Sequence, residues 1–357
     1  MSKERIDNIL NHLCDNESKT VFLNRLAYTK EPSMQNLRVL TGLSEAPVIN
    51  TIDAFIKLGN KVCIYGVGYE TTHPGRALCR LFFDHLAGVY DQNASSIKVA
   101  KGYGMRIPVQ EPEKILEAGE DIIVVVTAAN PKYQAEIFTK LTYLGIPAWR
   151  ILFLPAPLFD FNKIDYFSFP FLTYTDEEVF IDCGCYDGAT AKLFADVLKG
   201  LSKPLPKKVI AYEPNTAQFT ICRENTNDLP FVEIRPFGVW DKTETIGFIV
   251  PKDASAGLRI DQGGEETLQV VALDDNLKDE KVTFIKMDIE GAEMEALRGA
   301  ERIIKANRPK LAICVYHKPA DLFEIPEYII NLGLNYNLYM RHQSLWMWDT
   351  VLYAVPK

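Results

Sequence analysis

Apolar positions along this chain follow two periods, one typical of helices and one of strands. Up to residue 60 they repeat three or four apart, which predicts a helical segment, as at Ile6, Ile9, Leu10, Leu13, Ile49, Ile52, Phe55 and Ile56. Short apolar runs then alternate with helix-period segments. These runs predict strands at 61–65, 88–90, 122–127 and 151–154. Strands that alternate with helices predict a parallel sheet with helices on its faces.

A second series of the same kind occupies the carboxy-terminal half. Its apolar runs predict strands at 178–182, 208–212, 231–235, 282–288 and 311–316. Helical patterns fill most of the gaps, at 189–198, 216–224 and 293–304, while 246–250 and 268–271 alternate like extra strands. The sequence therefore predicts an α/β protein with two doubly wound, Rossmann-like domains.

Prolines and aromatic residues mark the boundary between the two series. Pro155 and Pro157 interrupt the alternation, and an aromatic stretch with Phe159, Phe161 and Tyr166 follows. A linker with so many aromatic residues is expected to pack against the fold. We therefore divide the chain into a helical segment (1–60), a Rossmann-like recognition domain (61–157), an aromatic linker (158–177) and a second domain (178–357).

Composition and charge narrow the classes of partner. The chain has 357 residues, of which 47% are apolar and 24% charged, as in an ordinary folded protein of two domains. Its 47 acidic residues exceed its 39 Lys and Arg, and the net charge of -8 argues against nucleic acid and anionic membranes. The sequence shows no apolar run of bilayer length and no signal peptide, so we expect no membrane insertion and a cytoplasmic location.

The seven cysteines argue against a disulfide framework, because their number is odd and most stand within apolar segments. Cys183 and Cys185 form a C-x-C pair, but no second Cys or His pair stands near them at the spacing of a zinc site.

A glycine-rich turn follows the first strand of the first series. Gly66 and Gly68 end that strand, and Asp91 follows the next strand, where nucleotide-binding folds place an acid for a ribose. The third glycine of the dinucleotide fingerprint is displaced to Gly75 by an insertion over 69–74. Two interpretations stay open, a dinucleotide site and a structural or substrate-recognition turn.

The segment 179–188 carries the strongest chemical signal in the chain. A glycine at 184 permits a tight turn and lets a ligand lie against bare backbone, and Gly188 permits close approach to the following helix. Asp182 and Asp187 disfavour a phosphate but suit a ligand with an ammonium group and ribose hydroxyls, such as S-adenosylmethionine. Glu213 ends the next strand, where its carboxylate would accept both ribose hydroxyls in the same crevice.

A third chemical segment ends the strand at 282–288. Alternation places Lys286 and Asp288 on one face of that strand. Glu290 and Glu293 follow near a helix start, where the helix dipole favours acids, so capping is the alternative role for Glu293. The neighbouring strand brings His317 to the same rim, and an imidazole beside carboxylates can accept a hydroxyl proton.

Together these segments resemble the FkbM-type S-adenosylmethionine-dependent methyltransferases over roughly 178–357. The motifs that carry the resemblance are Ile181-Asp182-Cys183-Gly184-Cys185-Tyr186-Asp187-Gly188, Tyr212-Glu213-Pro214-Asn215, Leu273-Asp274-Asp275, Ile285-Lys286-Met287-Asp288-Ile289-Glu290-Gly291-Ala292-Glu293 and Leu297-Arg298-Gly299-Ala300. The resemblance implies a class I methyltransferase sheet with an antiparallel last strand, which fits the closing apolar segments 334–340 and 345–355. It also implies O-methylation as the usual reaction.

The resemblance further implies where S-adenosylmethionine binds. The residues expected to hold it are Asp182, Gly184, Cys185, Tyr186, Asp187, Gly188, Glu213, Pro214, Asn215, Gly238, Val239 and Asp288. Adenine contacts are expected near Phe237 and Trp240, which flank Gly238 and Val239.

The expected catalytic residues are His317, Glu290, Asp288 and Lys286. His317, oriented by Glu290 or Asp288, would deprotonate a hydroxyl of a small-molecule or glycan acceptor, and Lys286 would position that acceptor. Many family members have a carboxylate at the end of the strand before this histidine, whereas this chain has Val315 and Tyr316. The departure favours a histidine base, and we predict no metal.

Two other functions are kept as alternatives. The first is a dehydrogenase whose nicotinamide cofactor binds at Gly66 and Gly68, and the second is a scaffold with an inert cofactor pocket. Homo-oligomer formation also stays open.

Overall fold

The chain folds into two compact units, each assembled from separate stretches of sequence. The computed structural model describes residues 2–68, 73–155, 158, 165–249, 259–260 and 266–357. One unit comprises Met1–Leu26, Asp165–His342 and Trp348–Lys357, and the other comprises Ala27–Ile164 and Gln343–Met347. Residues 69–72 of the insertion over 69–74, and also Pro157, Phe159, Phe161 and Val250, lie outside the described residues.

The larger unit is built on a seven-stranded sheet with the order β16-β17-β15-β14-β7-β8-β9. The strands of this sheet are β7 (Val179–Cys183), β8 (Lys208–Tyr212), β9 (Val232–Arg235), β14 (Phe284–Met287), β15 (Lys310–Cys314), β16 (Tyr336–His342) and β17 (Thr350–Pro356). All of them fall within or beside the predicted strand segments.

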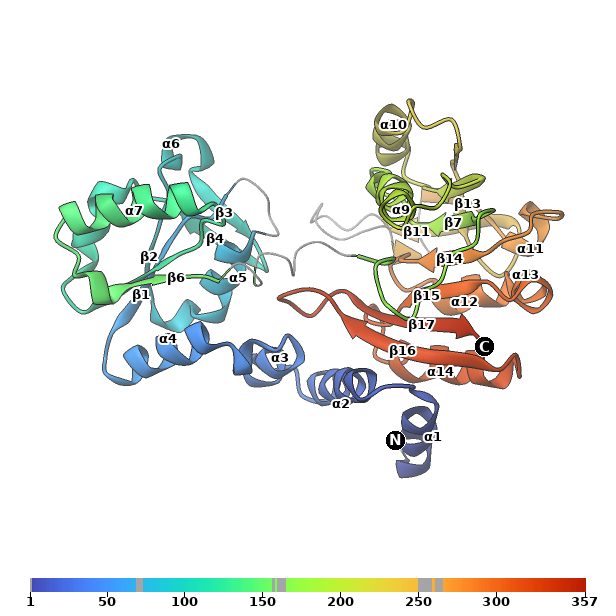
Figure 1. Ribbon diagram of the computed structural model, residues 1–357, viewed down its shortest axis with the longest axis horizontal. Helices are drawn as coiled ribbons and strands as arrows, with labels where there is room; N and C mark the ends of the chain where they lie inside the picture. Colours follow the sequence, from blue (N-terminus) through green and yellow to red (C-terminus); the bar gives the residue numbers. More distant parts are fainter. Residues whose placement is uncertain (1, 69–72, 156–157, 159–164, 250–258, 261–265) are drawn as a thin grey trace. The chain divides into compact units, whose positions relative to one another are not determined.

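The last strand, β17, runs antiparallel to both of its neighbours, while β7, β8, β9, β14 and β15 are parallel. Figure 1 shows β16 and β17 in red beside the orange strands β15 and β14. The predicted doubly wound sheet with an antiparallel last strand is confirmed. The closing strand predicted at 345–355 was too long, because residues 343–349 form the connection between β16 and β17, and Gln343–Met347 of that connection belong to the other unit.

Strand alternation sends two kinds of side chain to the two faces of this sheet. Ile181 and Ile285 join the main core, to which the helices at 3–12, 16–30, 293–298, 301–307 and 321–331 contribute. Phe180 and Phe284 point to the opposite face, where they meet Phe167 and Phe194 of the helix at 189–200. Phe167 follows the aromatic stretch, and its side chain is fully buried in this cluster.

The helices of this unit are α1 (Lys3–His12), α2 (Asn16–Lys30, which continues into the other unit), α9 (Ala189–Gly200), α10 (Thr216–Asn225), α11 (Leu273–Asn276), α12 (Glu293–Arg298), α13 (Glu301–Asn307) and α14 (Asp321–Asn331). The helix predicted at 293–304 is in fact two. It breaks at Gly299, where a Cβ atom would lie 2.1 Å from the carbonyl oxygen of Trp240. The break thus lies where two segments approach closely, and glycine also weakens a helix.

A small second sheet, of order β10-β13-β11-β12, contains the predicted extra strands. Its strands are β10 (Gly238–Val239), β11 (Glu244–Ile249), β12 (Arg259–Ile260) and β13 (Glu266–Val271).

The other unit has a parallel sheet of order β2-β1-β5-β6 and a hairpin, β3-β4. Its strands are β1 (Lys61–Tyr65), β2 (Leu86–Tyr90), β3 (Val99–Gly102), β4 (Met105–Pro108), β5 (Ile122–Val126) and β6 (Ile151–Phe153). Its helices are α3 (Met34–Leu40), η1 (Leu43–Glu45), α4 (Pro47–Lys57), α5 (Pro74–Leu81), η2 (Phe83–His85), α6 (Ala94–Ile97), η3 (Pro112–Ala118), α7 (Pro131–Tyr143) and η4 (Ala148–Arg150). A Rossmann-like arrangement is present here as predicted.

The glycine turn of this unit is held by its own side chains. The buried Arg76 guanidinium donates to the carbonyls of Val67 and Gly68, and Asp91 accepts the N–H of Val67 at 3.0 Å. Gly75 packs against the turn, since a Cβ there would lie 2.2 Å from the carbonyl oxygen of Gly66. Gly75 thus provides the close approach of helix and turn that the fingerprint assigns to its third glycine.

Within the described ranges, no helix combines the length and the apolar character that crossing a bilayer requires.

Candidate active site

The carboxyl ends of β7, β8 and β14 lie side by side, because β7 pairs with both of the other strands. The register places Cys183 beside Met287 on one side and beside Tyr212 on the other. The turns that follow these strands hold Gly184, Glu213 and Asp288. The structure therefore brings the three predicted chemical segments to one edge of the sheet.

Gly184 lets the turn after β7 touch the turn after β14. Its φ is +84°, and a Cβ atom would lie 2.0 Å from the carbonyl oxygen of Asp288. Its N–H donates to the carbonyl of Tyr212 at 3.0 Å. Any side chain at this position would push the two turns apart.

A buried ion pair between Asp182 and Lys286 supports this turn. Asp182 is 0% exposed, and its Oδ1 lies 3.1 Å from Lys286 Nζ. The same ammonium donates to the carbonyl of Gly184 at 2.9 Å and lies 5.3 Å from the centre of the Tyr166 ring. Burial alone lowers the pKa of Lys286, but the charges of Asp182 and Asp288 raise it above its ordinary value. Asp182 was predicted to hold the cofactor and Lys286 to position the acceptor. In our proposal both act indirectly, because they shape the Gly184 turn.

Glu213 is fixed by two backbone groups. Its Oε2 accepts the N–H of Tyr186 at 3.1 Å, and its Oε1 accepts the N–H of Asn215 at 2.9 Å. Burial raises the pKa of Glu213. Each oxygen keeps a second acceptor position, so the carboxylate fits a pair of ribose hydroxyls. The Tyr186 side chain is 62% exposed, which leaves its backbone as the part that shapes the site.

The remaining predicted residues of the β7 turn anchor it to α10. The thiol of Cys185 is buried 3.3 Å from that of Cys222. The carbonyl of Asp187 accepts from the side chain of Asn225 at 2.9 Å, and a Cβ at Gly188 would lie 2.6 Å from Thr226.

Asn215 and its neighbour Pro214 lead into the same helix, because the Asn215 side chain accepts the N–H groups of Ala217 and Gln218 at its start. Gly238 and Val239 belong to β10 of the small sheet, where Val239 joins the main core. Their adenine contacts stay a prediction.

Three carboxylates of the turn after β14 surround His317, which follows β15. Nδ1 of His317 lies 2.9 Å from Glu293 Oε1, and Nε2 lies 3.5 Å from Asp288 Oδ1 and 3.6 Å from Glu290 Oε2. The imidazole is only 9% exposed. Gly291 has a φ of +97°, a backbone conformation that favours glycine, and a Cβ there would lie 3.0 Å from Cε of Lys318.

Asp288 accepts hydrogen bonds from two tyrosines that were not among the predicted site residues. The Tyr166 hydroxyl donates to Oδ2 at 3.0 Å, and the Tyr316 hydroxyl donates to Oδ1 at 2.9 Å. The sequence offers a signal for Tyr316, because this residue stands beside His317 at the end of a strand. It offers none for Tyr166, which lies 122 residues from Asp288 in an aromatic stretch that was expected only to pack against the fold.

The surroundings shift the pKa values of His317 and Asp288 in opposite directions. Burial alone would lower the pKa of His317, but its close contact with Glu293 and the charges of Glu293, Asp288 and Glu290 raise it to about 9. Burial alone would raise the pKa of Asp288, but Lys286, His317 and the two tyrosine hydroxyls hold it below its ordinary value. At neutral pH the cluster therefore contains a carboxylate at Asp288 and an imidazolium at His317.

The same cluster is the place where a metal would have to bind among the described residues. Asp288, Glu293 and His317 each place one potential ligand atom within 4.8 Å of the others. Both oxygens of Asp288 accept tyrosine hydroxyls, whereas Nδ1 of His317 and Oε2 of Glu293 are buried and make no hydrogen bond within the described residues. The absence of a metal stays a prediction.

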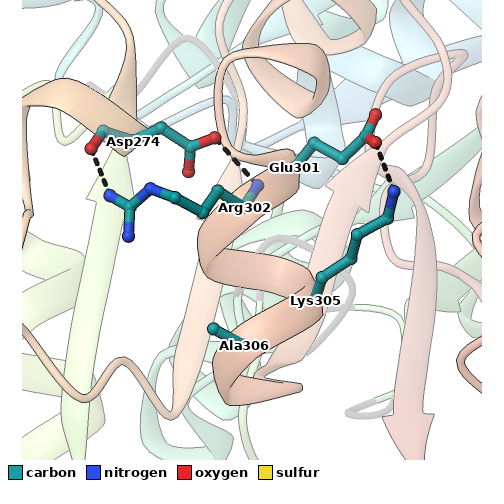
Figure 2. Close-up of a pocket in the computed structure, with 5 residues that line it drawn as sticks. All are labelled: Asp274, Glu301, Arg302, Lys305 and Ala306. Atoms are coloured by element: carbon teal, nitrogen blue, oxygen red, sulfur yellow. Dashed lines mark hydrogen bonds and ion pairs between the residues drawn. The ribbon is translucent and has the colours of Figure 1, made fainter.

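A separate surface depression is lined by side chains that bond to one another (Figure 2). Asp274 accepts the N–H groups of Arg302 and Ile303 at 2.8 and 2.9 Å, and Lys305 pairs with Glu301. The Asp274 carbonyl also accepts from the Arg302 guanidinium. Asp274 thus satisfies the first N–H groups of α13, which gives the Leu273-Asp274-Asp275 motif a structural role.

Replacing Asp274 with alanine is expected to lower the free energy of unfolding by about 1–2 kcal/mol, the usual cost of a lost helix cap. Denaturant unfolding followed by circular dichroism measures this. The control is Asp279→Ala. Asp279 is an exposed acid that also precedes β14 in the sequence, and its replacement should change the free energy of unfolding by less than about 0.5 kcal/mol. Equal losses in the two variants would contradict the capping role.

Comparisons with known proteins give the following findings. Residues 182–339 match the family described as methyltransferase FkbM domain. A methyltransferase FkbM from Methylobacillus flagellatus KT is similar in structure, with 18% identity, a TM-score of 0.48 and coverage of 90% of this chain and 99% of that one. An O-methyltransferase from Bacillus cereus in complex with SAH has 15% identity, a TM-score of 0.33 and coverage of 51% and 75%. Aeropyrum pernix fibrillarin with natively bound S-adenosyl-L-methionine has 12% identity, a TM-score of 0.33 and coverage of 50% and 66%. No curated protein sequence matches the chain.

Proposed function

We propose that this protein, whose residues 182–339 match the family described as methyltransferase FkbM domain, transfers a methyl group from S-adenosylmethionine to a hydroxyl of a sugar or other polyol. The observation that carries the proposal is the joint placement of the Gly184 turn, Glu213 and the His317 cluster at one edge of the sheet. A methyl transferase needs a donor pocket and a proton acceptor side by side, and these groups supply both.

The donor side of the site fits S-adenosylmethionine by the chemistry of its residues. Glu213 offers acceptor positions to ribose hydroxyls, and the positive-φ backbone at Gly184 leaves room beside the strand end. The carboxylate of Glu213, which pairs with no cation of the described residues, favours a cationic sulfonium ligand, whereas Asp182 is already paired with Lys286. When bound, S-adenosylmethionine supplies the methyl group, whose bond to sulfur breaks as its bond to the acceptor oxygen forms.

The acceptor side has to align one oxygen and take one proton. In its neutral form, which is the minor one at neutral pH because the pKa of His317 is raised to about 9, His317 accepts the acceptor's hydroxyl proton at Nε2, the nitrogen that faces Asp288 and Glu290. The imidazolium so formed is stabilised by the surrounding carboxylates and later returns its proton to solvent. Glu290, with 47% of its side chain exposed, is placed to accept a hydroxyl of a polyol.

The dehydrogenase alternative is disfavoured by the glycine turn of the other unit. His73 accepts the N–H of Gly75 at the start of α5, and Asp91 accepts the N–H of Val67. These two backbone donors of the described part of the turn are therefore bound within the protein and are not offered to a pyrophosphate. A recognition role for this unit remains part of the proposal.

Thermal unfolding in the presence of each candidate ligand tests the choice. S-adenosylmethionine at about 100 times its Kd should stabilise the protein by about 2.7 kcal/mol and raise the midpoint, whereas NAD should leave it unchanged. Turnover is then measured as release of S-adenosylhomocysteine with a panel of monosaccharides, glycosides and polyols. A shift with NAD alone would favour the dehydrogenase, and a shift with S-adenosylmethionine but no turnover by any hydroxyl or amine acceptor would favour the scaffold.

A further inference from the structure

One side chain of the candidate active site comes from outside the segment that matches the family. Tyr166 belongs to the aromatic linker before residues 182–339, yet its hydroxyl donates to Oδ2 of Asp288 at 3.0 Å. The residue is buried, with 4% of its surface exposed. Its neighbours in the linker, Phe167, Phe169 and Phe171, have no hydroxyl. The tyrosine thus adds a polar contact with the site to the packing that these phenylalanines provide.

We propose that Tyr166 is a positioning residue of the active site: its hydroxyl and that of Tyr316 hold the two oxygens of Asp288, so that this carboxylate faces the imidazole of His317 in one orientation. This inference rests on the proposed methyl transfer and names a group that acts on it through Asp288. Tyr316 donates to Oδ1 at 2.9 Å, and the same oxygen lies 3.5 Å from Nε2 of His317.

The orientation of Asp288 depends on such partners. The last torsion of an aspartate side chain has no sharp minimum of its own, so hydrogen bonds have to fix the plane of the carboxylate. A carboxylate that accepts a hydroxyl at each oxygen cannot turn without weakening both bonds. Asp288 nevertheless remains available, because 22% of its side chain is exposed and each oxygen keeps a second acceptor position.

The phenol ring of Tyr166 is held on its own account. Lys286 Nζ lies 5.3 Å from the centre of the ring, and the ring of Phe167 lies 6.1 Å away between centroids. The hydroxyl also lies 3.9 Å from Sγ of Cys314, a much weaker hydrogen-bond partner than a carboxylate. A fixed ring therefore directs the hydroxyl at Asp288.

Tyr174 supplies a matched comparison within the same linker. It is also buried, its hydroxyl donates to the carbonyl of Phe167 at 2.6 Å, and Lys310 Nζ lies 4.6 Å from the centre of its ring. The two tyrosines thus differ in what their hydroxyls hold. For Tyr166 this is a carboxylate of the site, and for Tyr174 it is the backbone of the linker.

A double-mutant cycle tests whether Tyr166 acts on Asp288, and it needs neither acceptor nor turnover. Thermal unfolding is followed for the unchanged protein, Tyr166→Phe, Asp288→Ala and the double variant. Tyr166→Phe keeps the ring and should lower the midpoint by a few degrees, but by about half as much or less when Asp288→Ala has removed the acceptor. Tyr174→Phe should cause the same shift in both backgrounds. Equal shifts for Tyr166→Phe in both backgrounds would overturn the proposal.

Steady-state kinetics with the single variants then separate positioning from packing. Tyr166→Phe should lower kcat by about 10-fold or more and leave KM for S-adenosylmethionine within about twofold, because the lost hydroxyl acts on the transfer step through Asp288. Tyr174→Phe should keep the full kcat. The proposal fails if the two variants have the same kcat, or if Tyr166→Phe raises KM alone.

Failure of the proposed function gives a different result. The unchanged protein would then bind no S-adenosylmethionine or turn over no acceptor of the panel. The unfolding cycle still decides in that case whether Tyr166 holds Asp288.

Discussion

Replacement of His317 by alanine is expected to lower methyl transfer by about 10²–10⁴-fold, the range that a positioned general base contributes. Affinity for S-adenosylmethionine should be unchanged, because the donor pocket is built from the turns after β7 and β8 while His317 follows β15. Release of S-adenosylhomocysteine is measured with the best acceptor of the panel, and donor affinity by calorimetry. Glu290→Gln should also lose turnover and keep the donor, since its carboxylate lies 3.6 Å from Nε2.

His12, an exposed histidine of α1, supplies the matched control. His12→Ala should retain the full rate. A His317→Ala variant that keeps its activity would remove the histidine from the mechanism, whatever the donor affinity. Loss of donor binding in the same variant would instead show that the cluster is part of the donor pocket.

Replacement of Lys286 by methionine is expected to lower the free energy of unfolding by about 3–5 kcal/mol, the cost of leaving one partner of a buried ion pair alone. Asp182 would then lose its only ion-pair partner among the described residues, and the Gly184 carbonyl would lose its donor. Chemical denaturation without ligand measures the loss. The variant should also bind S-adenosylmethionine more weakly, because the Gly184 turn is no longer held.

The surface pair Lys203 and Asp176 provides the comparison, with the same ion types 2.9 Å apart but largely exposed. Lys203→Met should cost no more than about 1 kcal/mol. Combining Lys286→Met with Asp182→Leu should recover part of the stability, because it removes the unpaired charge. If Lys286→Met is no more damaging than Lys203→Met, the buried pair does not support the turn.

The parts of the fold that the sequence predicted are those with a local cause. The runs of apolar residues that became β7, β8 and β14 are buried on both faces, and their ends carry the glycines and acids of the site. The same local patterns predicted a last strand that is too long and a single helix in place of α12 and α13. In both places the deciding contact is remote in sequence: Gly299 meets Trp240, and the tip at Gln343–Met347 belongs to the other unit.

The same difference between local causes and remote contacts applies to the candidate site. Convergence of Gly184, Glu213 and Asp288 could be predicted because parallel strands end at one edge. The partner of the His317 Nδ1 could not, because a helix start explains an acid at 293 equally well. The contact of Tyr166 with Asp288 could not be predicted for a different reason. It depends on the path of a segment that has no regular pattern and that brings the Tyr166 ring close to Lys286.

The position of β17 has a consequence for how this protein is made on the ribosome. β17 follows β16 in the chain but lies between β15 and β16, so β16 has no neighbouring strand in the sheet until β17 has been made. A segment made much earlier waits as well, since Asp15 pairs with Arg341 and Leu13 bridges to Leu338. Domains usually fold in order as they leave the ribosome. Here the larger unit joins segments that are far apart in the chain, so a nascent chain halted before β17 would expose an unpaired edge of β15.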